Sequence, residues 1–100
     1  MIQVHARVTT TTSADVTQVD AAIESIRTNV VPLATSEGGK GIIVLIDRET
    51  GNGLTISLWQ DEAAMQASEE RANALRTSVA GQMGVSDPSV ARYEVAVFEV

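Results

Sequence analysis

The amino-acid sequence predicts an α+β domain in which two helices cover one face of a four-stranded antiparallel sheet. Along the chain the apolar residues recur with a period of two, then of three to four, in the order strand–helix–strand–strand–helix–strand. A "TGNG" turn joins the two middle strands as a hairpin. With 100 residues, 44% of them hydrophobic, the chain is long enough for one core. We therefore expect one domain over residues 1–100, with the strand order 4-1-3-2.

The first half supplies one strand and one helix. Residues 2–9 alternate strictly, with Ile2, Val4, Ala6 and Val8 on the apolar side. Thr12 or Ser13 is then expected to cap a helix whose first turn Asp15 reinforces. Pro32 is expected to bend the last turns of this helix, and "SEGGKG" ends it. The apolar stripe of the helix has steps of three and four residues and comprises Val16, Val19, Ile23, Ile26, Val30 and Leu33.

The second half begins with an almost continuously apolar segment, residues 41–49, which reads as a strand covered on both faces. Residues 54–60 alternate, and Asp61 then caps a helix, with Glu62 at its positive end. The last strand is expected over residues 90–100. The inward stripe of the second helix comprises Met65, Ser68, Ala72, Leu75 and Val79.

The two faces of the sheet differ in polarity, and we expect the helices to cover the more apolar one. That face holds the apolar side of the first strand together with Leu54, Ile56, Leu58, Tyr93, Val95 and Val97. The opposite face then carries His5, Arg7, Thr55, Ser57, Trp59, Arg92, Glu94 and Phe98. Monomers rarely expose a patch containing such large apolar side chains, so we expect a second copy to pack on it as a homodimer. Arg7, Arg92 and Glu94 would pair there and fix the register.

Composition narrows the class of partner and cofactor. The net charge is −6, with 7 basic against 13 acidic residues, which argues against binding nucleic acid or an anionic membrane. The chain has no cysteine and one histidine, so no metal site is expected. No apolar run reaches the roughly 18 residues that span a bilayer, and the start does not read as a signal peptide. A cytoplasmic protein is the expectation.

The element order, the loop "EGGKGIIVL", the junction "LTISLWQDEAAMQASEE" and the closing "RYEVAVFEV" resemble the dimeric α/β-barrel superfamily, in its antibiotic-biosynthesis-monooxygenase-like branch. The resemblance covers nearly the whole chain. It implies a ferredoxin-like domain that dimerises through its sheet into an α/β barrel. It also implies an oxidoreductase that oxygenates a small aromatic or phenolic compound without metal or flavin cofactor.

The chain departs from the pattern of active members at two places. Such members often carry a Glu two residues before the tryptophan, where this chain has Ser57. They often carry a His nine or ten residues after it, where this chain has Ser68 and Glu69. Haem degradation, which needs that His, is not expected here.

Candidate site residues each have a structural alternative. Trp59 would stack on a flat ligand, with Ser57 beside it, or would fill the core or an interface. His5 would act as an acid or base, or would be a hydrogen-bonded interface residue. Tyr93 would donate a proton, or would pack in the core with its hydroxyl at the rim.

Arg7 and Arg92 would hold an anionic oxygen of the ligand, or would form an ion pair with Glu94. The sequence thus leaves two functions open. One is a cofactor-free monooxygenase with His5, Arg7 and Tyr93 as catalytic residues and Trp59, Ser57 and Arg92 binding the substrate. The other is a non-catalytic small-molecule-binding or assembly module of the stress-responsive-like type of dimeric α/β barrel, in which the same residues close the dimer.

Overall fold

A computed structural model describes residues 4–12, 14–36, 38–82, 84–85 and 88–99. The first half comprises β1 (His5–Thr11), the short η1 (Val16–Gln18), α1 (Val19–Ser25), the π-helical η2 (Ile26–Val30), α2 (Val31–Ala34) and β2 (Gly39–Ile46). The second half comprises β3 (Gly53–Trp59), α3 (Glu62–Ala67), α4 (Glu69–Gln82) and β4 (Ser89–Glu94). The predicted α+β, ferredoxin-like order is confirmed, with each helix divided into segments.

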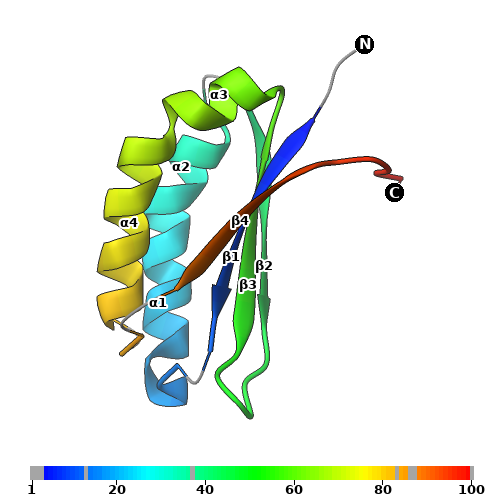
Figure 1. Ribbon diagram of the computed structural model, residues 1–100. Helices are drawn as coiled ribbons and strands as arrows, with labels where there is room; N and C mark the ends of the chain where they lie inside the picture. Colours follow the sequence, from blue (N-terminus) through cyan, green and yellow to red (C-terminus); the bar gives the residue numbers. More distant parts are fainter. Residues whose placement is uncertain (1–3, 13, 37, 83, 86–87, 100) are drawn as a thin grey trace.

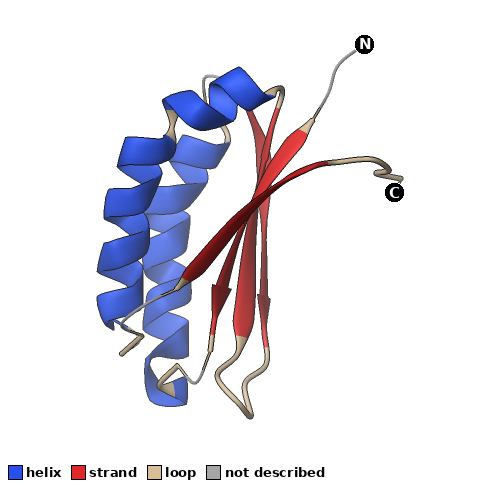
Figure 2. Ribbon diagram, in the orientation of Figure 1, coloured by secondary structure: helices blue, strands red, loops and turns tan. Residues whose placement is uncertain are grey.

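The sheet has the order β2-β3-β1-β4, and all three strand pairs are antiparallel. This is the predicted order, with the first and third strands central. The helices form one layer against one face, and none of the described residues forms a helix on the other face of the sheet (Figures 1 and 2). Two apolar clusters fill the space between the layers, one around Ala22, Ile26 and Val79 and one around Leu33, Trp59 and Met65.

The predicted assignment of the two sheet faces is wrong, because the polar face is the one that the helices cover. The Arg7 side chain reaches the α3–α4 junction, and Trp59, 2% exposed, packs against Leu33 and Met65. Strand alternation then places Ala6, Val8 and their cross-strand partners on the helix-free side. Ile2, which was expected on the same side, lies outside the described residues.

The helix-free face is therefore the apolar one. Ile43 is 39% exposed, Leu45 49% and Tyr93 58%. The strand that was expected to be covered on both faces, β2, lies at the sheet edge and exposes part of its apolar run. Monomeric proteins rarely expose so large a contiguous apolar surface to water.

The first helix begins, and changes its winding, at identifiable residues. Asp15 caps it by accepting a hydrogen bond from the Thr17 amide at 2.9 Å, so it does more than the reinforcing role predicted for it. Ser13, one of the two predicted caps, lies outside the described residues. The π-helical turn Ile26–Val30 ends two residues before Pro32, which lies in the first turn of α2 and has no amide hydrogen to donate.

The second helix is broken at Ser68, where α3 ends and α4 begins. Asp61 caps α3 as predicted, accepting from the Ala64 amide at 2.8 Å. The break leaves the Met65 carbonyl free to accept from side chains, and the Ser68 hydroxyl donates to it at 2.7 Å. The junction thereby becomes a polar spot facing the sheet.

The final strand is shorter than predicted, ending at Glu94. The chain continues away from the helices, with the Val95 amide donating to the Val4 carbonyl at 2.8 Å (Figure 1). Val97 and Phe98 are 77% and 63% exposed. This segment extends the apolar character of the helix-free side beyond the sheet.

Candidate functional site

A partly open cavity lies between the sheet and the helices and has a volume of about 90 Å³. Its floor comes from alternate residues of the central strands, including Arg7, Thr9, Thr55, Ser57 and Trp59. Its walls are mostly aliphatic and come from both helical arms, including Val19, Ile26, Val30, Leu75 and Val79. Thr9, Thr55 and Ser57 have small side chains, which leave space between this part of the sheet and the helices.

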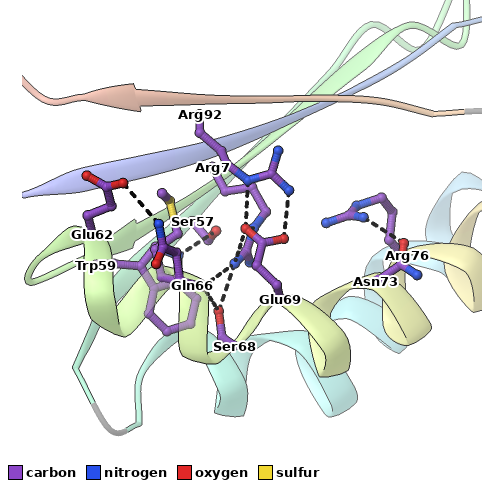
Figure 3. Close-up of polar contacts among 11 residues, drawn as sticks. Arg7, Ser57, Trp59, Glu62, Gln66, Ser68, Glu69, Asn73, Arg76 and Arg92 are labelled. Carbon is purple, nitrogen blue, oxygen red and sulfur yellow. Dashed lines mark hydrogen bonds and ion pairs between the residues drawn. The ribbon is translucent and has the colours of Figure 1, made fainter.

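Arg7 is the central charged group of the site, only 3% exposed. Its Nη2 donates to the Met65 carbonyl at 2.7 Å and to the Ser68 hydroxyl at 2.8 Å, and its Nε donates to Glu69 Oε1 at 3.3 Å (Figure 3). Burial lowers the pKa of Arg7, while the charge of Glu69 opposes that change. The guanidinium stays charged, since arginine is effectively always protonated in proteins.

Trp59, at the end of β3, borders both the cavity and the core. Its indole Nε1 donates to the Ser57 hydroxyl at 3.0 Å, so the buried N–H is satisfied. The Arg7 guanidinium carbon lies 5.4 Å from the ring centroid, within the range of a cation–π contact. Ser57, itself buried, therefore positions the indole. The Trp59 side chain packs in the core and also lines the cavity, so it can have a structural role and contact a ligand.

Glu69, not the predicted Glu94, is the carboxylate that pairs with both arginines. Arg92 binds it bidentately, with two hydrogen bonds of 2.7 Å, and Arg7 shares the Oε1 atom (Figure 3). Hydrogen bonding from Arg92, with the charges of Arg7 and Arg92, lowers the pKa of Glu69 to about 2. The same bond raises the pKa of Arg92. The pair ties α4 to the edge strand β4.

The remaining predicted catalytic residues do not join this group. His5 Nε2 lies 3.7 Å from Glu62 Oε2 at the end of the sheet, and His5 does not line the cavity. Tyr93 lies on the helix-free face and is 58% exposed in the isolated chain, so the predicted core packing of its ring is wrong. The structure thus brings Arg7, Ser57, Trp59 and Arg92 together and leaves His5 and Tyr93 apart from them.

Three residues of the site escaped the sequence-based prediction: Ser68, Glu69 and Arg76. Arg76 lines the cavity from α4, where it lies on the same helical face as Glu69 and Ala72. Ser68 was read as part of an apolar stripe, and its hydroxyl instead accepts from Arg7. Ser68 and Glu69 could have been identified as site residues from their position in the sequence, because active members of the resembled family often carry a histidine there.

The site combines a fixed cation, an aromatic edge and aliphatic walls. Among the described residues, the titratable groups that line the cavity are Arg7 and Arg76. Within the described ranges, no group of three or more His, Cys, Asp or Glu side chains is placed to hold a metal ion. None of the described helices is both long and apolar enough to cross a membrane. Such a cavity suits a small apolar molecule with one negatively charged or hydrogen-bond-accepting group.

No family model matches the chain. It is 34% identical over 94 residues to the uncharacterised protein Rv2557 of Mycobacterium tuberculosis, covering 93% of this chain and 41% of that protein. The chain therefore spans about two fifths of the length of this curated relative.

Solved structures with the same fold come from several bacteria. A candidate antibiotic biosynthesis monooxygenase from Nitrosomonas europaea superposes with a TM-score of 0.73 at 14% identity, covering 96% of this chain and 93% of that one. The ActVA-Orf6 monooxygenase of Streptomyces coelicolor, in complex with nanaomycin D, gives 0.70 at 14%, covering 99% and 92%. SnoaB, a cofactor-independent oxygenase of Streptomyces nogalater, gives 0.62 at 12%, covering 100% and 97%. The chain thus has the fold of the antibiotic-biosynthesis-monooxygenase-like proteins, as the resemblance predicted.

Proposed function

We propose that the cavity binds a small aromatic or phenolic compound and that the protein oxygenates it without metal or flavin cofactor. The observation that carries this proposal is the buried Arg7 guanidinium beside Trp59 on the floor of a cavity whose walls are mostly aliphatic. A phenolate oxygen facing Arg7 would be stabilised in a site that excludes most water. The fold shared with ActVA-Orf6 and SnoaB supports the choice of oxygen chemistry.

In this proposal a phenol loses its hydroxyl proton and the hydrogen of one ring carbon, and gains one oxygen atom at that carbon. The second oxygen atom of O2 leaves as water with the two hydrogens, so the substrate supplies all the electrons. The chain contributes orientation and electrostatics: Arg7 favours the phenolate, Trp59 bounds the ring, and the aliphatic walls limit water. The three hydrogen bonds on Arg7 hold its guanidinium in place before the substrate binds.

A non-catalytic binding module is the second candidate, and one observation favours it. The titratable groups on the described cavity walls are guanidiniums, which do not act as general bases at neutral pH. An oxygenase of this geometry therefore needs a substrate that ionises in solution or on contact with Arg7. A binding module needs no such step.

The apolar helix-free face supports a further part of the proposal, a homodimer formed face to face through the two sheets. Ile43, Leu45 and Tyr93 would be covered by the second copy, as would the exposed Val97 and Phe98. Because the two faces are exchanged relative to the prediction, Trp59 and Arg7 stay in the cavity of each protomer rather than in the interface. We propose a cytoplasmic location for this dimer.

Oxygen uptake on a panel of single-ring phenols and quinols tests the activity. We expect uptake with at least one compound, reduced strongly in Arg7→Lys, which keeps the charge but loses the bidentate fork. Trp59→Phe should reduce uptake as well, whereas Tyr93→Phe on the opposite face should leave it unchanged. Saturable binding without uptake across the panel would support the binding module instead.

A further inference from the structure

Arg76 is a cation at the cavity wall without a carboxylate partner among the described residues. Its Nη1 donates to the side-chain carbonyl of Asn73 at 3.0 Å, a neutral acceptor (Figure 3). The side chain is half-buried and lines the cavity. A partly desolvated guanidinium is costly unless an anion accompanies it.

The nearby carboxylate of Glu69 is directed at the other two arginines, and the hydrogen bond of the Arg76 side chain goes to Asn73 instead. Both oxygens of Glu69 accept from Arg92, and Oε1 also accepts from Arg7. Arg7, Arg76 and Arg92 lie close enough to influence one another, so three guanidiniums share one carboxylate. Burial, followed by the charge of Arg7, lowers the pKa of Arg76. In a chain of net charge −6, this local excess of positive charge stands out.

We propose that Arg76 selects the charge of the ligand, so that the cavity takes a single-ring aromatic compound whose ionised acid group lies against Arg76. This inference rests on the proposed function and specifies its ligand class. It differs from the expectation that Arg92 would hold the anion, since Arg92 is occupied by Glu69 and does not line the cavity.

The volume limits the ligand to one ring. The cavity measures about 90 Å³, which is below the roughly 150 Å³ of an engineered cavity that binds benzene. A single ring therefore fits only if part of the molecule extends toward the open side. Arg76, half-buried on the wall, is placed to meet an acid group at that position while the ring lies among the aliphatic residues.

The floor of the cavity offers further polar contacts for such a ring. Thr9 and Thr55 are direct cross-strand partners, and both line the cavity. Among the described residues neither hydroxyl makes a hydrogen bond, which leaves both able to bind a ring substituent. The ligand class is thus an aromatic acid or phenolate with one or two small polar substituents.

The test uses benzoate and its uncharged isostere benzamide, titrated into the ¹⁵N-labelled protein. The single tryptophan gives one indole N–H signal, and its ring borders the cavity, so that signal reports binding directly. We expect benzoate to bind about tenfold more tightly than benzamide, since one charge-assisted hydrogen bond contributes roughly that factor. In Arg76→Gln this preference should disappear, with the affinity for benzamide unchanged.

Two variants make the result specific. Arg76→Lys keeps the positive charge and should retain a preference for benzoate. Arg71→Gln removes an exposed arginine from the same helix and should behave as the wild type. Equal affinity of the wild type for both probes, or a preference that persists in Arg76→Gln, would overturn the proposed role of Arg76 but not the proposed function. Absence of any shift of the indole signal with either probe would overturn the proposed function as well.

Discussion

The ion-pair cluster between α4 and β4 predicts a specific loss of stability in acid. Glu69→Gln preserves the shape of the side chain but removes the charge that Arg7 and Arg92 share. Lowering the pKa of Glu69 from 4.5 to about 2 corresponds to roughly 3.4 kcal/mol, at about 1.36 kcal/mol per pH unit. Because the Glu69 side chain is 27% exposed, water screens the pair, and we expect a loss of about 2 kcal/mol at neutral pH.

The sign of the pH dependence follows from the lowered pKa. Such a carboxylate stabilises the fold above its unfolded-state pKa, and the contribution disappears as the pH falls through the folded-state value. The difference between wild type and Glu69→Gln should therefore shrink from pH 4.5 downward and vanish near pH 2. Urea denaturation at several pH values measures it.

The exposed neighbour provides the matched control, since Glu70→Gln should change the free energy of unfolding by less than about 0.5 kcal/mol at any pH. A Glu69→Gln difference that is absent at neutral pH, or that stays constant down to pH 2, would refute the pairing of this carboxylate with Arg92 and Arg7.

Three further predictions address other parts of the structure. Gly51→Ala should lower the free energy of unfolding by at least about 2 kcal/mol, because Gly51 has φ +78° and an added Cβ would collide with the backbone oxygen of Ala14. Gly81→Ala should not, because Gly81 lies on a helix with open space around it, and thermal melts compare the two variants. Ile56→Glu on the helix-free face should convert a dimer to a monomer in light scattering, whereas Thr77→Glu on the exposed helix surface should not. Ser57→Ala should cost about 1–3 kcal/mol in urea denaturation by leaving the buried indole N–H without its acceptor.

The order of the elements could be predicted from the sequence because local patterns determine it. The helix stripe from Val19 to Leu33, the cap at Asp61 and the turn before Gly53 each depend on residues within a few positions of one another. The strand order then followed from the number and sequence of elements. These features survive in the structure with shifts of a few residues at the element ends.

The identity of the covered face could not be predicted, because alternation marks two faces but does not say which one meets the helices. We assigned Val8 and Ile56 to the core as the more apolar choice, yet the helices lie over Arg7 and Trp59. The rule that helices cover the more apolar face of a sheet assumes a monomer with one buried face. It fails where the apolar face is available to another molecule and the covered face surrounds a cavity.

The polar network around Glu69 could not be predicted from the sequence either, because its members are far apart in the chain. Arg7 and Glu69 are separated by 62 positions, and their contact depends on the break at Ser68 that brings the start of α4 over β1. A continuous helix through Ser68 was the simpler prediction from the apolar stripe. The break exposes the Met65 carbonyl to Arg7, and neither local propensity nor periodicity signals that partner.

The most direct test of the account asks whether the space between the sheet and the helices is the ligand site. Catechol is titrated into the protein and Trp59 emission is followed in the wild type, in Ala72→Leu and in Ala74→Leu. Ala72 lines the cavity and Ala74 is exposed on the same helix, so only the first substitution fills the space. We predict a saturable change in emission that persists in Ala74→Leu and is lost in Ala72→Leu. Equal binding by Ala72→Leu and the wild type would contradict the account.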